Sequence, residues 1–308
     1  MTRAGPLRHL VVGAGLIGRP LAERLAERGD SVAIATRSGS AARGATALVL
    51  DASDPAAFSR AAAGASTIFL CTNPKYTEWA SRWPPIFRAA ITAARDSGAS
   101  LVVMGNLYPY GSPSGPMTER SPETTTEEKG LIRLAGWNQV RAAHERGEIR
   151  AVEVRASDYF GAGVGGTAHL GRTFFTAVRR SKTAHVIGRP EIEHSWSYLP
   201  DIVTTLIAAS DHTAEWGRVW HVPSGAASRT AIVTQLNELH KTRGKVSGYP
   251  QWLLRSMGMV SPMLRAVYAS SYQFLVPYVI DSADTERELG VRATPWDQAL
   301  AATAESYR

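Results

Sequence analysis

The chain has 308 residues, of which 44% are hydrophobic and only 20% charged, and its net charge is +7. The apolar fraction excludes a disordered chain and predicts a large buried core, in two unequal lobes rather than one domain. The single cysteine, Cys71, excludes an intramolecular disulfide framework and a cysteine-based metal cluster.

The positive charge comes from 29 arginines against 5 lysines, and these residues are scattered along the chain. The densest group is Arg172, Arg179, Arg180 and Lys182, without the basic tail or interleaved aromatic motif that typically binds nucleic acid. We therefore expect solvated arginines and no nucleic-acid partner. A positive field that attracts an anionic cofactor or substrate stays open as an alternative.

The hydropathy pattern also bears on location. No apolar stretch reaches the roughly 18 residues of a membrane span, and no basic-then-apolar leader opens the chain. The sequence thus predicts no membrane partner and a place in the reducing cytoplasm. For the assembly we expect a monomer or a homodimer.

The first strong motif is a glycine-rich loop between a strand and a helix. A short buried strand over 9–12 meets Gly13-Ala14-Gly15-Leu16-Ile17-Gly18, and an amphipathic helix follows, before a second strand over 31–35. In this context GxGxxG indicates a dinucleotide site. Gly13 permits the tight turn, Gly15 lets the backbone approach the pyrophosphate, and Gly18 lets helix pack on strand. The helix N-terminal amides, at Leu16 and Ile17, would hold the phosphate charge. A Rossmann-like unit without nucleotide is the alternative.

Strands and helices continue to alternate as far as residue 156. The apolar runs predict strands over 47–50, 67–71, 101–104 and 151–156, and helices over 55–63, 84–97 and 126–146. Strands separated by helices at this spacing predict an α/β fold with a Rossmann-type doubly wound parallel sheet.

Beyond Gly161 the pattern loosens. We expect helices near 167–180, over 200–210, 230–241 and 296–307, shorter helices within 252–274, and a strand over 218–222. The predicted organisation is an NAD(P)-binding Rossmann domain over 1–160 and a smaller substrate-binding lobe over 161–308. About 195–225 would return to the Rossmann domain.

The end of the second strand bears on the choice of dinucleotide. An NAD site usually places an acidic side chain about 20 residues beyond the glycine loop, where it accepts the ribose hydroxyls. Here Thr36-Arg37-Ser38 contains no acid. The Arg37 guanidinium can pair with a 2′-phosphate and Ser38 can add a hydrogen bond, which predicts NADP(H) over NAD(H). An exposed surface arginine is the alternative.

Several motifs together are similar to one known family. They are the Gly13–Gly18 loop, Asp51 after the third strand, Tyr110-Gly111 after the fifth, and the segments 155–161 (RASDYFG), 196–202 (WSYLPDI) and 221–225 (HVPSG). Over most of its length the chain resembles an extended short-chain dehydrogenase/reductase of the NAD-dependent epimerase/dehydratase type.

The resemblance implies places for several residues. Asp51 would lie near the adenine, and Cys71, Thr72 and Asn73 would pass the cofactor. The nicotinamide end would be flanked by Ala156, Ser157 and Asp158. Substrate contacts would come from Tyr110, Tyr159, His194 and Trp196, although a lone loop histidine such as His194 is also commonly structural.

The sequence departs from the family at the catalytic positions. The family usually has GxxGxxG, a Ser or Thr after strand five and a Tyr-x-x-x-Lys pair, in which the lysine lowers the tyrosine pKa. By spacing, Asn106 replaces the Ser, Lys129 the Tyr and Arg133 the Lys. Tyr108 is therefore the preferred acid, Asn106 could hold the substrate oxygen, and Lys129 could serve as acid or bind the ribose. Alternatively, Tyr108 packs under its loop, and Lys129 and Arg133 are solvated on one helix face.

Three functions follow. The first is an NADP(H)-dependent oxidoreductase that transfers a hydride to or from a carbonyl or alcohol carbon of a small organic molecule, with a non-standard proton donor. The second is a non-redox isomerase, dehydratase or cyclase on the same scaffold. The third is a regulatory protein that only binds the dinucleotide.

Two other features complete the sequence prediction. The histidines show no His-x-x-x-His pair, so we predict no metal site. The Met- and aromatic-rich stretch 252–268 predicts either an apolar wall over a hydrophobic substrate or a core or oligomer contact.

Overall fold

The computed structural model describes residues 8–166, 168–212, 214–250, 252, 259, 265 and 268–307. These residues form two compact units. Unit 1 comprises Met1–Pro109, Glu128–Arg155 and Ile202–Trp220, and unit 2 comprises Tyr110–Glu127, Ala156–Asp201 and His221–Arg308.

Unit 1 is built on a seven-stranded sheet in the order β10-β6-β5-β4-β1-β2-β3. The β1–β2, β2–β3, β1–β4 and β4–β5 pairs are parallel, so the predicted Rossmann-type α/β fold is confirmed. The strands are β1 (His9–Val12), β2 (Val32–Thr36), β3 (Thr46–Val49), β4 (Thr67–Leu70), β5 (Ser100–Asn106), β6 (Arg150–Ala156) and β10 (Val219–His221).

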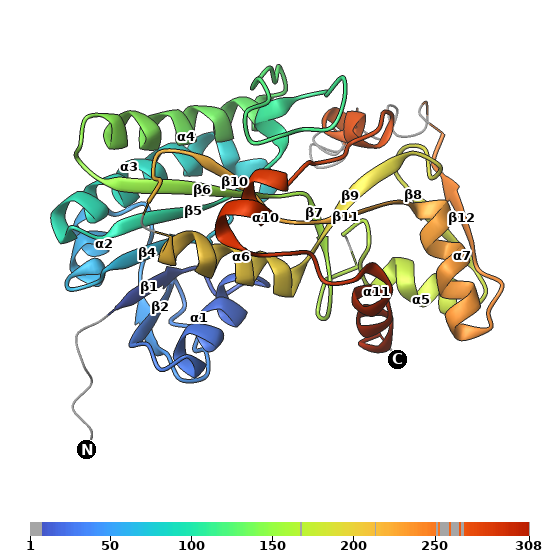
Figure 1. Cartoon of the computed structure of the whole chain (residues 1–308), viewed down its shortest axis with the longest axis horizontal. Helices are drawn as coiled ribbons and strands as arrows, with labels where there is room; N and C mark the ends of the chain where they lie inside the picture. The colour runs from blue at the N-terminus through green and yellow to red at the C-terminus, as the bar shows by residue number, and fades with distance from the viewer. Residues whose placement is uncertain are drawn as a thin grey trace. The chain divides into compact units, whose positions relative to one another are not determined.

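Helices cover both faces of this sheet. Figure 1 shows α2 (Pro55–Ala62), α3 (Trp79–Ser97) and α4 (Glu128–Glu145) on one face, and α1 (Gly18–Glu27) and α6 (Leu199–Asp211) on the other. On that second face Arg24 Nη1 of α1 donates to Thr204 Oγ1 of α6 over 3.0 Å. Helices on both faces explain why these strands are continuous apolar runs rather than alternating ones.

The third helix begins earlier than the sequence predicts, at Trp79 rather than Pro84. Prolines at 84 and 85 suggest a helix start, because proline removes a backbone donor that an interior position needs. Pro84 and Pro85 cannot donate to the carbonyls four residues earlier, which are those of Ala80 and Ser81. These two residues are exposed, so water can bind their carbonyls instead. The buried side chains of Trp79 and Trp83 add core contacts to this first part of α3.

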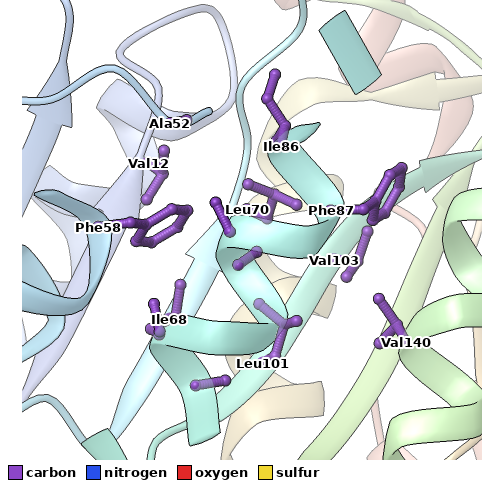
Figure 2. Close-up of a cluster of buried hydrophobic side chains, with 14 of the residues drawn as sticks. Val12, Ala52, Phe58, Ile68, Leu70, Ile86, Phe87, Leu101, Val103 and Val140 are labelled. Carbon is purple, nitrogen blue, oxygen red and sulfur yellow. The ribbon is translucent and has the colours of Figure 1, made fainter. Parts of the chain in front are cut away.

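One hydrophobic core of unit 1 lies between the sheet and the helices α2, α3 and α4. Figure 2 shows Ile86 and Phe87 of α3 next to Leu70 of β4 and Val103 of β5, while Phe58 of α2 faces Val12 of β1. Each large apolar side chain buried in this way contributes about 1.5–3 kcal/mol. The core therefore fixes the strands whose carboxyl ends carry the predicted site residues.

Unit 2 contains short strands that the sequence analysis did not predict. The strands β7 (Asp158–Phe160), β9 (Glu193–Tyr198) and β11 (Gly225–Ser228) form one sheet, and β8 (Thr183–Val186) and β12 (Lys245–Gly248) form another. They are too short to show a clear alternation of polar and apolar residues.

The described helices of unit 2 include α5 (Arg172–Arg179), α7 (Arg229–His240), α10 (Ala283–Leu289) and α11 (Trp296–Glu305). Its core includes Phe160, Phe175, Trp196 and Leu236. Of the stretch 252–268, only Trp252, Met259, Arg265 and Tyr268 are described, so most of the predicted apolar wall lies outside the described residues. Among the described helices, none has the length and apolar character needed to cross a bilayer.

Candidate functional site

The glycine-rich loop lies where the strand order of the unit 1 sheet reverses. It follows β1, which is flanked by β2 on one side and β4 on the other, and ligands of doubly wound sheets bind at such a switch point. A Cβ on Gly13 would lie 2.8 Å from the Thr72 backbone nitrogen, and one on Gly18 only 1.9 Å from the Gly13 carbonyl oxygen. Gly13 is therefore required by the close approach of the chain after β4, and Gly18 by the packing of the loop itself.

Gly15 differs from its two neighbours. It is exposed, and a Cβ there would meet no atom within 4 Å. No side chain caps α1 at Ile17, and the first turn of the helix carries no acidic residue. The open space beside Gly15 thus faces a helix N-terminus, whose partial positive charge favours a phosphate group. These residues fit the pyrophosphate of a dinucleotide.

Arg37 and Ser38 lie in the turn after β2. Thr36 Oγ1 accepts a hydrogen bond from the Ser40 backbone amide over 2.8 Å, and the Ser38 and Ser40 hydroxyls are 2.8 Å apart. The exposed Arg37 side chain forms no ion pair or hydrogen bond with any described residue. Its guanidinium is accessible to an anionic ligand.

Asp51 is held by its own loop. Its Oδ1 accepts hydrogen bonds from the hydroxyl and the backbone amide of Ser53, at 2.6 and 3.0 Å, and lies 3.3 Å from Arg82 Nη2. The hydrogen bonds from Ser53, with Arg82 nearby, lower the pKa of the Asp51 carboxyl.

Beyond β4, loss of hydration raises the pKa of the Cys71 thiol to about 12, so this thiol is protonated at neutral pH.

An aromatic and cationic cluster lies in the segments that follow β4 and β5. Tyr76 belongs to a 3-10 turn (Tyr76–Glu78) and Tyr108 to another (Tyr108–Tyr110). The Tyr76 hydroxyl donates to the Tyr108 hydroxyl over 3.3 Å. The buried Lys129 ammonium of α4 lies 4.4 Å from the Tyr76 ring centroid. We call Tyr76, Tyr108 and Lys129 the phenol–lysine cluster.

Sequence reasoning named Tyr108 and Lys129 of this cluster but missed Tyr76. The position of Tyr76 in the sequence could have indicated it as a site residue, because Tyr76 follows the carboxyl end of β4 as Tyr108 follows that of β5. Asn106 lies beside the cluster, and its Oδ1 accepts the Tyr108 backbone amide over 3.2 Å. Asn106 thus fixes the backbone that carries the Tyr108 phenol.

Arg133 points into the protein rather than toward solvent. Its side chain is 2% exposed, its Nη2 donates to the Met104 carbonyl over 2.6 Å, and its guanidinium carbon lies 4.2 Å from the Trp83 ring centroid. Burial lowers the pKa of Arg133 to about 10, and the attraction of Glu153 offsets only part of that loss. Arg133 therefore anchors α4 to the end of β5, two residues before Asn106.

A second buried arginine shares the Glu153 carboxylate. Arg155 Nε donates to Glu153 Oε2 over 2.7 Å, while Arg133 Nη2 lies 3.6 Å from Glu153 Oε1. A Cβ on Gly105 would lie 2.7 Å from the Glu153 side chain. One carboxylate thus stands between two guanidiniums and fills the space that Gly105 leaves.

In unit 2 the predicted residues Ser157, Asp158 and His194 lie together. His194 Nε2 is 3.0 Å from Asp158 Oδ2 and 3.3 Å from the Ser157 hydroxyl, and its Nδ1 faces the Gln273 carbonyl at 3.2 Å. Burial tends to raise the pKa of Asp158, but the hydrogen bond from His194 and nearby positive charges outweigh it and lower that pKa. In a nucleophile triad the serine and the acid bind different nitrogens of the histidine ring. Here Ser157 and Asp158 both lie at His194 Nε2, so these three residues do not form such a triad.

The remaining predicted substrate residues are mostly engaged inside unit 2. The Tyr110 hydroxyl lies 2.7 Å from His221 Nε2, and Trp196 Nε1 donates to the Ala227 carbonyl over 3.0 Å. Tyr110, Trp196 and His194 are all buried. Asp158, whose side chain is 27% exposed, and the half-buried Tyr159 are more accessible.

The predicted residues therefore form two groups. Unit 1 contains the glycine loop, Arg37, Ser38, Asp51, Cys71, Thr72, Asn73, Asn106, Tyr108, Lys129 and Arg133, and unit 2 contains Tyr110, Ala156, Ser157, Asp158, Tyr159, His194 and Trp196. Across the described part of the chain, no three His, Cys, Asp or Glu side chains gather in a way that could hold a metal ion.

Comparison with known proteins places this geometry in a family. The model of the NAD dependent epimerase/dehydratase family matches residues 9–222. No curated protein gives a significant match to the sequence.

Solved structures show the same fold over nearly the whole chain. UDP-glucose 4-epimerase from Thermotoga maritima, crystallised with UDP-glucose, has a TM-score of 0.79 at 15% identity and covers 98% of both chains. UDP-glucuronic acid 4-epimerase from Bacillus cereus, with UDP-glucuronic acid and NAD, has a TM-score of 0.78 at 15% identity, covering 97% of this chain and 98% of its own. DesIV, the dTDP-glucose 4,6-dehydratase from Streptomyces venezuelae, with NAD, has a TM-score of 0.75 at 18% identity, covering 98% of this chain and 97% of its own.

Proposed function

The chain belongs to the NAD dependent epimerase/dehydratase family, and from that premise we propose an NADP(H)-dependent oxidoreductase that acts on a carbonyl or alcohol of a small organic molecule. The observation that carries the proposal is the phenol–lysine cluster at the strand ends of the sheet that bears the glycine loop. The cluster would supply an acid in place of the family's tyrosine, which the sequence predicts to be replaced by Lys129.

The dinucleotide would be held by the glycine loop, with its pyrophosphate beside Gly15 and the N-terminus of α1. When bound, the nicotinamide supplies or accepts a hydride at the substrate carbon. The protein binds and orients the two reactants, and it moves the proton at the substrate oxygen.

Tyr108 is the proposed proton donor in the direction of reduction. Its hydroxyl gives a proton to the substrate oxygen, and the hydrogen bond that it accepts from Tyr76 stabilises the phenolate that remains. Asn106 holds the Tyr108 backbone in place. In the direction of oxidation, the same phenolate accepts the proton from the alcohol.

The proposed preference for NADP(H) rests on the accessible Arg37 guanidinium. We expect Arg37→Ala to weaken NADPH binding by about 10- to 100-fold, since a charge-assisted hydrogen bond contributes about 1.5–3 kcal/mol. NADH binding should stay unchanged. Fluorescence titration of both nucleotides against wild type and variant gives the dissociation constants. The exposed Arg60, at the end of α2, provides Arg60→Ala as the control. A wild-type preference for NADH, unaffected by Arg37→Ala, would reject the assignment.

A second function has support of its own. The solved structures with this fold include epimerases and a dehydratase, crystallised with NAD or with UDP-sugars. In an epimerase or a dehydratase the cofactor returns to its starting redox state, so the net reaction is not redox. An isomerase or dehydratase is therefore the alternative to a net oxidoreductase.

One experiment separates these functions. Purified protein with NADPH and a panel of carbonyl compounds, and separately with NADP and nucleotide sugars, is followed by the near-ultraviolet absorbance of the reduced nicotinamide and by product analysis. For a reductase we expect absorbance to fall in step with product. Product without net absorbance change favours the isomerase or dehydratase. Tight nucleotide binding without product from either panel leaves a binding-only regulatory protein.

A further inference from the structure

We propose that Tyr76 is a positioning residue that tunes the Tyr108 phenol, so that a second phenol does here what a lysine does in the family. This inference rests on the proposed role of Tyr108 as proton donor. The structure brings Tyr76 to that place from a different element, because it follows β4 whereas Tyr108 follows β5.

The hydrogen bond between the two phenols sets the direction of the effect. The Tyr76 hydroxyl donates over 3.3 Å to the Tyr108 oxygen. A hydrogen bond donated to an oxygen stabilises its charged form more than its neutral form. Tyr76 therefore favours the Tyr108 phenolate, which is the form left after proton transfer.

Lys129 acts on the same pair through the Tyr76 ring. Its buried ammonium lies 4.4 Å from the ring centroid, a distance at which a cation is attracted by the π-electrons. A positive charge next to Tyr76 makes its hydroxyl a stronger donor to Tyr108. The order of action is thus Lys129, Tyr76 and then Tyr108.

The cluster is held by rigid neighbours. The Trp79 ring packs edge-on against the Tyr76 ring, with centroids 5.1 Å apart, and lies 6.1 Å from the Tyr108 ring. Trp79 is buried at the start of α3. Replacing Tyr76 with phenylalanine removes one hydroxyl and keeps the ring that contacts both Trp79 and Lys129.

The test measures the ionisation of Tyr108 itself rather than turnover. Full-length protein is labelled with fluorotyrosine, and the Tyr108 signal in the fluorine NMR spectrum is assigned as the one lost in Tyr108→Phe. Its chemical shift is then followed against pH in wild type and in Tyr76→Phe. We expect the midpoint to rise by about half a pH unit to one unit in Tyr76→Phe. The exposed Tyr249 provides Tyr249→Phe as the matched control, with no change in the midpoint.

A second pair of variants tests the order of action. Lys129→Met should raise the Tyr108 midpoint in the wild-type background but should add little in Tyr76→Phe. A midpoint unchanged by Tyr76→Phe would overturn the proposal, as would an equal effect of Lys129→Met in both backgrounds. These outcomes are independent of the reaction, because full turnover by Tyr108→Phe would reject Tyr108 as proton donor without changing the titration.

Discussion

Tyr108→Phe is expected to slow the chemical step by about 10²-fold or more, because it removes the proposed proton donor. It also removes the acceptor of the Tyr76 hydrogen bond. The phenylalanine ring keeps the contact with Trp79, and the glycine loop is untouched. NADPH binding and the thermal unfolding temperature should therefore match wild type. Single-turnover kinetics with a carbonyl compound that the wild-type protein reduces gives the rate of the step.

The specificity of this effect can be checked within the same chain. Tyr249→Phe removes a hydroxyl from an exposed tyrosine of unit 2 and should leave the rate at the wild-type value. Near-normal turnover by Tyr108→Phe would eliminate Tyr108 as the acid and would point to Lys129, the other acid that the sequence offers.

Glu153→Gln is expected to lower the free energy of unfolding by about 3–5 kcal/mol. Glu153 is fully buried and its carboxylate lies between the guanidiniums of Arg133 and Arg155. Burial already lowers the pKa of Arg133, and the charge of Arg155 adds to that effect. Removing the negative charge takes away the carboxylate that offsets the repulsion between Arg133 and Arg155. Urea unfolding at neutral pH, compared with wild type, measures the loss.

A double variant identifies the cause. Arg133→Met combined with Glu153→Gln removes one positive charge together with the negative one, so it should be more stable than Glu153→Gln alone. Glutamine has nearly the volume of glutamate, so the fit against Gly105 is kept in both variants. An unfolding free energy unchanged by Glu153→Gln would mean that the carboxylate does not hold this buried cluster together.

The glycine loop shows what local sequence could establish. A Cβ on Gly18 would lie 1.9 Å from the Gly13 carbonyl oxygen, within one strand–loop–helix unit. A Cβ on Gly13 would lie 2.8 Å from the backbone nitrogen of Thr72, which follows the neighbouring strand β4. Such contacts join residues close in sequence or follow directly from the parallel sheet, and the predicted α/β fold is confirmed. The short strands β7, β9 and β11 of unit 2 were missed, because long-range pairing rather than a local pattern defines them.

The contacts of the phenol–lysine cluster could not be predicted from residue spacing. The sequence by itself determined the Rossmann-type fold, since this depends on local periodicity. It predicted the glycine loop as a dinucleotide site and the replacement of the family's Tyr-x-x-x-Lys pair from residue spacing alone. Only the tertiary structure brought Tyr76 to Tyr108 and Lys129 and turned Arg133 toward Met104 and Trp83. The physical reason is that side-chain direction depends on how α4 packs against β5 and α3, and residue spacing along one helix does not specify that packing.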